Sequence, residues 1–424
     1  MLWRRPLGKT FVASGTIQAL NVVTGIVLAR GLGPHGRGEL AAILLWTILV
    51  GSVGSFGLPE ALTYETASER ENARSAIGTA VRTWLVLSLA LVAVGAGVLT
   101  LTLGGYDAAT RTSGYLLLAL IPLYLFTNLC AAALQGLGAM GAFNLVRTLV
   151  SAAIAAGVVG IDVLGGLTVR TAALTYIATY LVTAVAGIVS LRRTSFWSVA
   201  FDRRVLRRMA GYGLRSQSSF ISSTLIEYLD QLLISLLLGA TSLGLYAIAT
   251  TLTSATTLAA STVGLVAFPR LAALPSGPLR ANAARRFALL AVGASALITI
   301  PILAATPQMI DLLFGDAFGR VATVCRVLLV GNVFLASTQI LVALLRGLGR
   351  PLDAGTAGGV GLVVTVVLLA ALLPTLGLMG AAIASLVAYA VTAWWMLRKV
   401  CGALSLSIPQ FLHGSSVPAM GELA

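Results

Sequence analysis

The hydrophobic positions of this chain form long, unbroken runs that are separated by short polar or glycine-rich segments. A helix that crosses a membrane needs about 20 predominantly apolar residues. Strands of a membrane barrel show only about ten residues each, with alternating polarity, so the pattern excludes a barrel. The runs predict twelve spanning helices, at residues 11–30, 40–60, 80–103, 114–135, 142–163, 171–191, 215–238, 245–268, 286–306, 322–344, 355–374 and 378–397.

Composition leads to the same class of protein. Of the 424 residues, 58% are hydrophobic and 10% are charged, and the mean hydropathy is +0.96. Soluble domains carry about 25% charged residues. The expected fold is therefore an all-α integral membrane protein. The sequence has two histidines and three scattered cysteines, so we expect no metal site, and Cys130 and Cys325 read as small core residues.

The basic residues predict the orientation in the membrane. With the N-terminus in the cytoplasm, 22 of the 28 basic residues fall on the cytoplasmic side, five fall on the opposite side, and Arg326 starts a span. Positive charge is enriched in cytoplasmic loops. Both termini are thus expected in the cytoplasm, and the net charge of +14 reflects topology, with no nucleic-acid partner.

The longest polar interruption lies at the midpoint, in SLRRTSFWSVAFDRRVLRRMAGYGLR (190–215). Its apolar residues alternate with arginines, a pattern typical of a helix lying in the membrane interface. We therefore expect an N-terminal six-helix lobe at 1–191, a basic amphipathic cytoplasmic linker at 192–214, a C-terminal six-helix lobe at 215–400 and a cytoplasmic tail at 401–424.

Internal matches predict that the two lobes are repeats. LGPHGRGELA (32–41) aligns with LGATSLGLYA (238–247), LQGLG (134–138) with LRGLG (345–349), and AALTYIATYLVTA (172–184) with AAIASLVAYAVTA (381–393). The offsets are nearly equal. Because both halves begin on the same side, the sequence predicts two six-helix bundles related by a parallel repeat.

One stretch matches a nucleotide-binding pattern by letter alone. Residues 31–36, GLGPHG, fit G-x-G-x-x-G. A dinucleotide fingerprint follows a strand inside a βαβ unit, whereas these residues lie between two predicted spans. Glycine and proline here are expected to end the first helix and allow the second to start close by.

Several segments together resemble a known family. They are LARGLGPHGRGELAA (28–42), SFGLPEALTYETA (55–67), LRGLGRPL (345–352) and LPTLGLMGAAIASLVAYAV (373–391). In this arrangement of two six-helix halves they are similar to the polysaccharide-type lipid-linked oligosaccharide flippases of the multidrug/oligosaccharidyl-lipid/polysaccharide exporter superfamily. The resemblance covers residues 8–400. Arg37 stands where an aromatic residue is commoner in the family.

The resemblance implies a transporter that is not an enzyme. The cargo would be a polyprenyl-pyrophosphate-linked oligosaccharide, moved by alternating access from the cytoplasmic to the outer leaflet for surface polysaccharide biosynthesis. The expected partners are this lipid-linked glycan, membrane lipids and polysaccharide polymerase or assembly proteins. No cofactor is expected. The sequence has no G-x-x-x-x-G-K-[ST] motif, so the expected drive is an ion gradient of H⁺ or Na⁺, a gradient of the substrate or its downstream consumption.

The strongest candidate for a functional site is an acidic pair in the seventh predicted span. Glu227 and Asp230 are three residues apart and share a helix face, with Tyr228 and Gln231 beside them. Ionisable groups inside spans are costly and mark functional sites. The pair is expected either to bind a coupling ion or sugar hydroxyls, or to form an ion pair with an arginine of the other lobe.

Cationic candidates follow from the expected pyrophosphate, which arginine binds in a bidentate manner. They are Arg30, Arg147, Arg215 and Arg326. Each also has a structural alternative. Arg147 and Arg215 can extend to the interface, Arg30 can cap its helix end, and Arg326 can pair with acidic residues of the preceding loop.

Weaker polar candidates complete the set. Gln18, Asn21 and Thr24 share one face of the first span and are expected to hold helices together or to line the cavity. Glu60 and Glu65 follow the second span and are expected to be solvated.

Two alternative functions remain open. A cation-coupled multidrug exporter of the same superfamily would need an acid-rich cavity, whereas arginines outnumber acids at the span ends of this chain. A membrane-bound glycan transferase or polymerase would need a large outer loop with catalytic acids or histidines, whereas the predicted outer loops are short.

Overall fold

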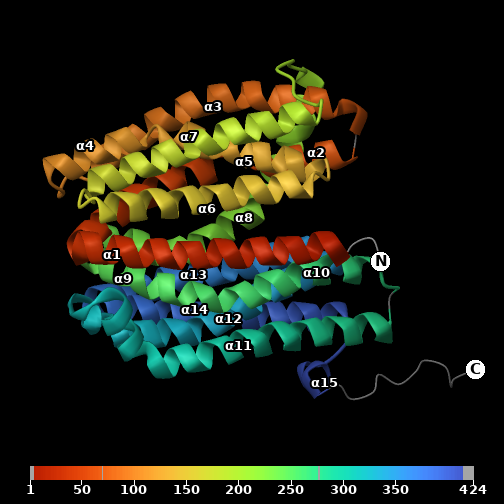
Figure 1. The fold of residues 1–424 in the computed structure, drawn as a ribbon. Coiled ribbons are helices and arrows are strands. Elements are labelled where there is room, and N and C mark those ends of the chain that lie inside the picture. The colour runs from red at the N-terminus through yellow and green to blue at the C-terminus, as the bar shows by residue number, and fades with distance from the viewer. Residues whose placement is uncertain (1–3, 69, 276, 414–424) are drawn as a thin grey trace, which may run out of the picture. The chain divides into compact units, whose positions relative to one another are not determined.

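The computed structural model describes residues 4–68, 70–275 and 277–413, and the regular elements within these ranges are helices (Figure 1). The α-helices are α1 (Arg4–Gly54), α2 (Leu58–Ser68), α3 (Ala73–Thr102), α4 (Ala108–Leu117), α5 (Leu120–Gly136), α6 (Met140–Val163), α7 (Val169–Arg193), α8 (Arg203–Leu237), α9 (Gly239–Thr253), α10 (Leu258–Ala273), α11 (Pro278–Phe314), α12 (Ala322–Gly347), α13 (Pro351–Leu376), α14 (Leu378–Ala403) and α15 (Ile408–His413).

The described residues contain ten helical stretches that are long and apolar enough to cross a membrane. One of them, Val12–Gly54, includes most of both predicted spans at 11–30 and 40–60. The predicted span at 215–238 lies in α8 and is not among the ten. An all-helical protein with multiple spans is confirmed, whereas the count of twelve stays a prediction.

A kink divides α1 at the glycine-rich segment. Gly33 has φ 67° and ψ 179°, values outside the helical region, and Pro34 follows it. A residue with a side chain rarely adopts positive φ, and the proline ring clashes with the carbonyl four residues earlier. The predicted break is therefore present, and α1 consists of two helices that meet at the kink at Gly33.

The matched segments of the predicted repeat share their backbone conformation. Gly33 and its counterpart Gly239 have φ values of 67° and 79°. Gly138 and its counterpart Gly349 have φ values of 73° and 78°. Left-handed residues are uncommon, so their occurrence at the same repeat positions supports the duplication independently of the letters.

Contacts between residues divide the chain into two compact units. The N-terminal unit comprises residues 1–221 and 231–248. Within it, α3, α5, α6 and α7 lie side by side (Figure 1), with their buried faces rich in alanine and leucine. Small residues let helix backbones approach closely in a membrane. Cys130 is buried in this core as a free thiol.

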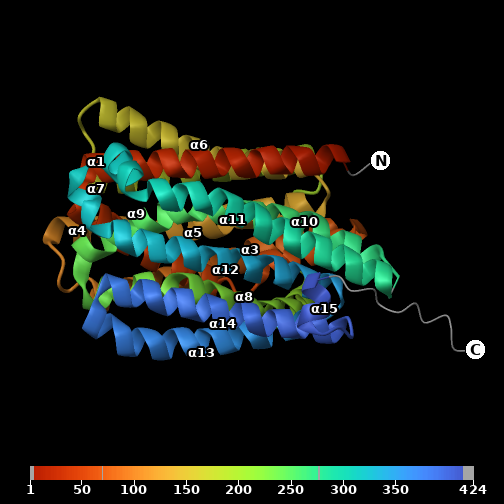
Figure 2. The same cartoon turned by 90° about the horizontal axis from the view of Figure 1, so that it is seen from below.

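The C-terminal unit comprises residues 222–230 and 249–424. Helix α12 packs against α10, α11 and α14, and α13 packs on α14 (Figure 2). The core again combines alanines with large aliphatic residues such as Ile340 and Leu344. Cys325 and Cys401 are buried as free thiols, which agrees with the expected core role of Cys325.

The prediction of an interfacial helix at the midpoint is wrong for part of the segment. Residues 194–202 lie outside the helices, and α8 begins at Arg203 and continues to Leu237. Val205 and Met209 are buried in the core of the N-terminal unit. The Asp202 backbone N–H donates to Thr79 Oγ1 over 3.0 Å. These contacts pack the segment against other helices of the protein. A helix in the membrane interface would instead expose its apolar face to lipid.

Candidate functional site

The acidic pair of α8 is partly buried inside the C-terminal unit. Asp230 is 3% exposed, and the Ser385 hydroxyl of α14 donates to its Oδ2 over 3.0 Å. Tyr389, one turn further along α14, is also buried. Glu227, one turn before Asp230, is exposed. The structure thus gives one carboxylate a hydroxyl partner and leaves the other accessible, an arrangement that suits a hard cation or a proton.

The neighbours of this pair are described only in part. Gln231 lies in the next position of α8, is half-buried and belongs to the N-terminal unit. Tyr228 is half-buried. Arg215 lies in α8, but its side chain is outside the described part of the chain. Its expected role therefore stays a prediction.

The remaining arginine candidates are distributed over both units. Arg30 is exposed on α1 and Arg147 is half-buried on α6, both in the N-terminal unit. The Arg147 guanidinium carbon lies 5.2 Å from the centroid of the Phe143 ring, one turn earlier on its own helix. Arg326 is exposed on α12 of the C-terminal unit.

The polar face of the first predicted span is uneven. Asn21 is exposed and Gln18 is half-buried. Thr24 is buried, and its hydroxyl donates to the Leu20 carbonyl of its own helix over 2.9 Å. The Thr24 hydroxyl therefore donates its proton within α1, and Asn21 is the most exposed of the three side chains.

A second polar cluster lies just after the kink of α1. Glu39 is 7% exposed and accepts a hydrogen bond from Thr110 Oγ1 of α4 over 2.7 Å. His35 Nε2 lies 3.4 Å from the same carboxylate oxygen. A cavity of about 260 Å³ adjoins the cluster, lined by His35, Glu39, Thr102, Gly105, Tyr106, Asp107, Ser235, Leu236, Gly239 and Ala240.

Two groups of this cavity have shifted pKa values. Hydrogen bonds from the Thr110 side chain and backbone N–H lower the pKa of Asp107, which caps the N-terminus of α4. Burial raises the pKa of Tyr106, whose hydroxyl lies 3.3 Å from Ser235 Oγ. At neutral pH the cavity wall thus carries an ionised aspartate and a neutral tyrosine.

The repeat-related glycine segments contact each other beside this cavity. A Cβ built on Gly38 would overlap the carbonyl oxygen of Ala240, and one built on Gly244 would overlap the carbonyl oxygen of Pro34. Pro34 and Ala240 are themselves repeat counterparts, as are Gly38 and Gly244. The contact is reciprocal, because the glycine of each segment packs on a backbone carbonyl of the other segment.

The expectation that Glu65 is solvated is wrong. Glu65 is 4% exposed and accepts from Arg208 Nε over 2.8 Å, with a second contact from Arg208 Nη2. The pair ties α2 to α8. Glu60 is half-buried rather than solvated, and its Oε2 is buried without a hydrogen-bond partner.

Further contacts fix the same two segments together. Gln217 of α8 donates to the Val53 carbonyl near the end of α1 over 3.0 Å. A Cβ on Gly57 would overlap the carbonyl oxygen of Gly213, so these backbones also touch. Sequence patterns missed this arrangement. Its one local signal was the SFGLPEALTYETA segment, which was noted only as a family resemblance.

Among the described residues, no group of three or more His, Cys, Asp or Glu side chains is placed to hold a metal ion. Carboxylates, hydroxyls and guanidinium groups can bind protons, monovalent cations, sugar hydroxyls or phosphate oxygens.

The sequence and the fold are similar to those of known proteins. A putative O-antigen transporter of Shigella flexneri is 25% identical over 393 residues, covering 89% of this chain and 90% of that protein. An inward-facing multidrug resistance MATE transporter of the MOP superfamily superposes with a TM-score of 0.74, at 18% identity, over 94% of this chain and 99% of that one.

The lipid II flippase MurJ, in an inward closed conformation, superposes with a TM-score of 0.76, at 14% identity, over 95% of this chain and 88% of that one. At such identities these structures show a shared fold. The family model described as "Polysaccharide biosynthesis protein" matches residues 8–274, more than half of the chain. This protein belongs to that family of polysaccharide biosynthesis proteins.

Proposed function

We propose that this protein flips a polyprenyl-pyrophosphate-linked oligosaccharide from the cytoplasmic to the outer leaflet of the cytoplasmic membrane. The observation that carries the proposal is the reciprocal contact at Gly38 and Gly244. Two turns that meet closely through backbone at their glycines, with few side-chain contacts between them, can close one end of a transport path and separate again. Membership of the family and the O-antigen transporter relative support a glycan cargo.

The proposal includes the expected architecture. Twelve crossings form two six-helix lobes, with both termini in the cytoplasm, and the lobes alternate between inward and outward access. Arg30, Arg147, Arg215 and Arg326 are the groups proposed to contact pyrophosphate. A guanidinium group forms two parallel hydrogen bonds with phosphate oxygens, which suits an anionic headgroup.

Coupling to an ion is proposed for the acidic pair of α8. The Asp230 carboxylate, which accepts from Ser385, and the exposed Glu227 would take up H⁺ or Na⁺. Burial disfavours the charged form of a carboxylate, so protonation or binding of a cation stabilises it. The ion would thus favour the conformation in which this site is formed.

Deletion of the gene tests the proposed cargo. Membranes of the deleted strain are expected to accumulate complete lipid-linked oligosaccharides, identified by mass spectrometry, while the surface polymer is lost. Expression of the wild-type protein is expected to restore both. Unchanged lipid intermediates, together with new sensitivity to cationic drugs, would instead identify a cation-coupled drug exporter, the function that the acidic pair alone favours.

A further inference from the structure

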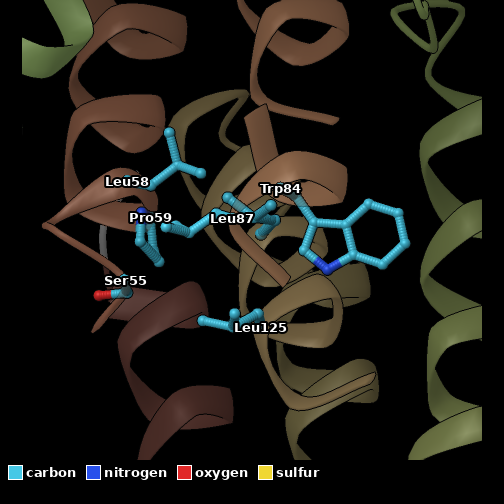
Figure 3. Close-up of a pocket in the computed structure, with 7 residues that line it drawn as sticks. Ser55, Leu58, Pro59, Trp84, Leu87 and Leu125 are labelled. Atoms are coloured by element: carbon cyan, nitrogen blue, oxygen red, sulfur yellow. The ribbon is translucent and has the colours of Figure 1, made fainter. Parts of the chain in front are cut away.

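The segment SFGLPEALTYETA (55–67) presents two chemically different sides. On one side, Ser55, Leu58 and Pro59 line an apolar pocket with Trp84, Leu87, Leu125 and Leu129 (Figure 3). This side anchors α2 to α3 and α5. The other side faces α8. It carries aromatic and acidic groups that lie outside the apolar core.

Two tyrosines form an exposed stack between α2 and α8. The ring centroids of Tyr64 and Tyr212 are 4.3 Å apart, and the rings are inclined by only 14°. Tyr64 is 51% exposed and Tyr212 is 40% exposed. Two neighbouring contacts fix the position of the stack. Glu65 pairs with Arg208, one turn before Tyr212. Gly213 packs on the backbone of Gly57. The two rings are therefore held together, and each remains partly exposed.

Phe56 is a strained aromatic residue whose backbone lies against that of Gly213, the residue after Tyr212. It has φ 49°, a left-handed conformation that is unfavourable for a bulky side chain, and it is 53% exposed. A Cβ built on Gly213, the residue after Tyr212, would lie 2.7 Å from the Phe56 carbonyl oxygen. Strain of this kind persists where surrounding contacts impose it, and it clusters at ligand sites.

Glu60 completes the set with an unused hydrogen-bond acceptor. It precedes Tyr64 by four residues on α2, so the two side chains share a helix face. Its Oε2 is buried and receives no hydrogen bond. An unsatisfied buried carboxylate oxygen is costly, and a rotation of this half-buried side chain toward the surface would let a ligand hydroxyl satisfy it.

We propose that Phe56, Glu60, Tyr64 and Tyr212 form a binding site for sugar rings. Aromatic faces carry partial negative charge and pack against the C–H face of a pyranose, while a carboxylate accepts from its hydroxyls. The inference rests on the proposed function, for which it identifies the element that recognises the glycan. Aromatic residues at a membrane interface also anchor proteins in lipid, but anchoring requires neither the strain at Phe56 nor the unpaired oxygen of Glu60.

Saturation-transfer difference NMR on the full-length protein in nanodiscs tests the site. The probe is the oligosaccharide released by mild acid from the lipid-linked fraction of cells that carry the protein. Wild-type protein is expected to transfer saturation from aromatic protons to sugar C–H groups. The Tyr64→Leu/Tyr212→Leu double variant is expected to bind about tenfold more weakly, equivalent to roughly 1.4 kcal/mol.

Two matched variants separate stacking from folding. Tyr64→Phe/Tyr212→Phe keeps both ring faces and is expected to restore most of the binding. Tyr115→Leu removes a similarly exposed tyrosine of α4, 43% exposed, and is expected to bind like the wild type. Binding of polyprenyl pyrophosphate without sugar is expected to be the same in the wild type and the double leucine variant.

Unchanged oligosaccharide binding by the double leucine variant would overturn the site, as would equal loss in the phenylalanine variant or an absence of binding by the wild type. The gene deletion tests the proposed function separately. If lipid-linked oligosaccharides accumulate in the deleted strain while the leucine variant still binds the free glycan normally, the function stands and the aromatic site fails.

Discussion

His35 and Thr241 occupy equivalent positions of the two repeats, 206 residues apart, and their side chains are in contact. His35 Nδ1 lies 3.2 Å from Thr241 Oγ1. The same imidazole approaches Glu39 through Nε2. A histidine that bridges two repeat-related segments adds polar contacts to the glycine contact at Gly38 and Gly244. This part of the N-terminal unit is therefore held by a reciprocal pair of backbone contacts and by polar side-chain contacts.

The glycine contact predicts an intolerance to side chains. Gly38→Ala places a methyl group on the Ala240 carbonyl, so the two backbones must separate. We expect the variant to lose about 1–3 kcal/mol of stability, as overpacked sites do, together with surface polymer. Thermal unfolding in detergent and polymer quantification measure both effects. Gly97→Ala is the control, because a Cβ there meets nothing within 4 Å, and it is expected to unfold no earlier than the wild type.

The hydroxyl of Ser385 is predicted to stabilise the buried carboxylate of Asp230. Ser385→Ala leaves that carboxylate with one partner fewer, and we expect a loss of about 1–3 kcal/mol. Ser337→Ala removes a hydroxyl that donates only to the Val333 carbonyl of its own helix, so a smaller loss is expected. Thermal unfolding with and without Na⁺ compares the two variants. Equal losses would contradict a special role for the Ser385 contact.

The Glu65–Arg208 pair is predicted to couple α2 to α8. A double-mutant cycle with Glu65→Gln and Arg208→Gln isolates the interaction, and we expect a coupling energy of about 1–2 kcal/mol, because Glu65 is buried while Arg208 is partly exposed. Urea unfolding in detergent measures it. Arg207→Gln changes the neighbouring arginine, which is exposed, and serves as the control. A coupling near zero would show that the pair contributes geometry without stability.

Asp107 predicts a dependence of stability on pH. Its pKa is lowered in the folded protein by hydrogen bonds from Thr110, so the folded state favours the ionised form. The stabilisation is fully present above the ordinary aspartate pKa of about 4 and is lost as the pH falls through the folded value. Asp107→Asn retains an N-cap side chain without this titration. Unfolding midpoints measured from pH 6 to pH 3 are expected to fall less in the variant.

Local sequence determined the class of this protein and most of its helices. Hydrophobic run length is a property of neighbouring residues, so the spans from residue 80 to 191 and from 286 to 397 correspond to helices of the structure. The predicted repeat rests on local features of the same kind, because Gly33 and Gly239 adopt a conformation that few other residues tolerate. These local features also carried the family resemblance that the family model bears out.

Only the tertiary structure decided which polar groups meet. Glu65 looked solvated because its partner Arg208 is 143 residues away, and no periodicity links the two. Tyr64 and Tyr212 come together only when α8 packs along the segment after α1. The midpoint segment is a second example. Its alternation of arginines and apolar residues suits a lipid interface as well as it suits a protein surface. Burial of Val205 and Met209 depends on the neighbouring helices that cover them, which lie far away in the chain.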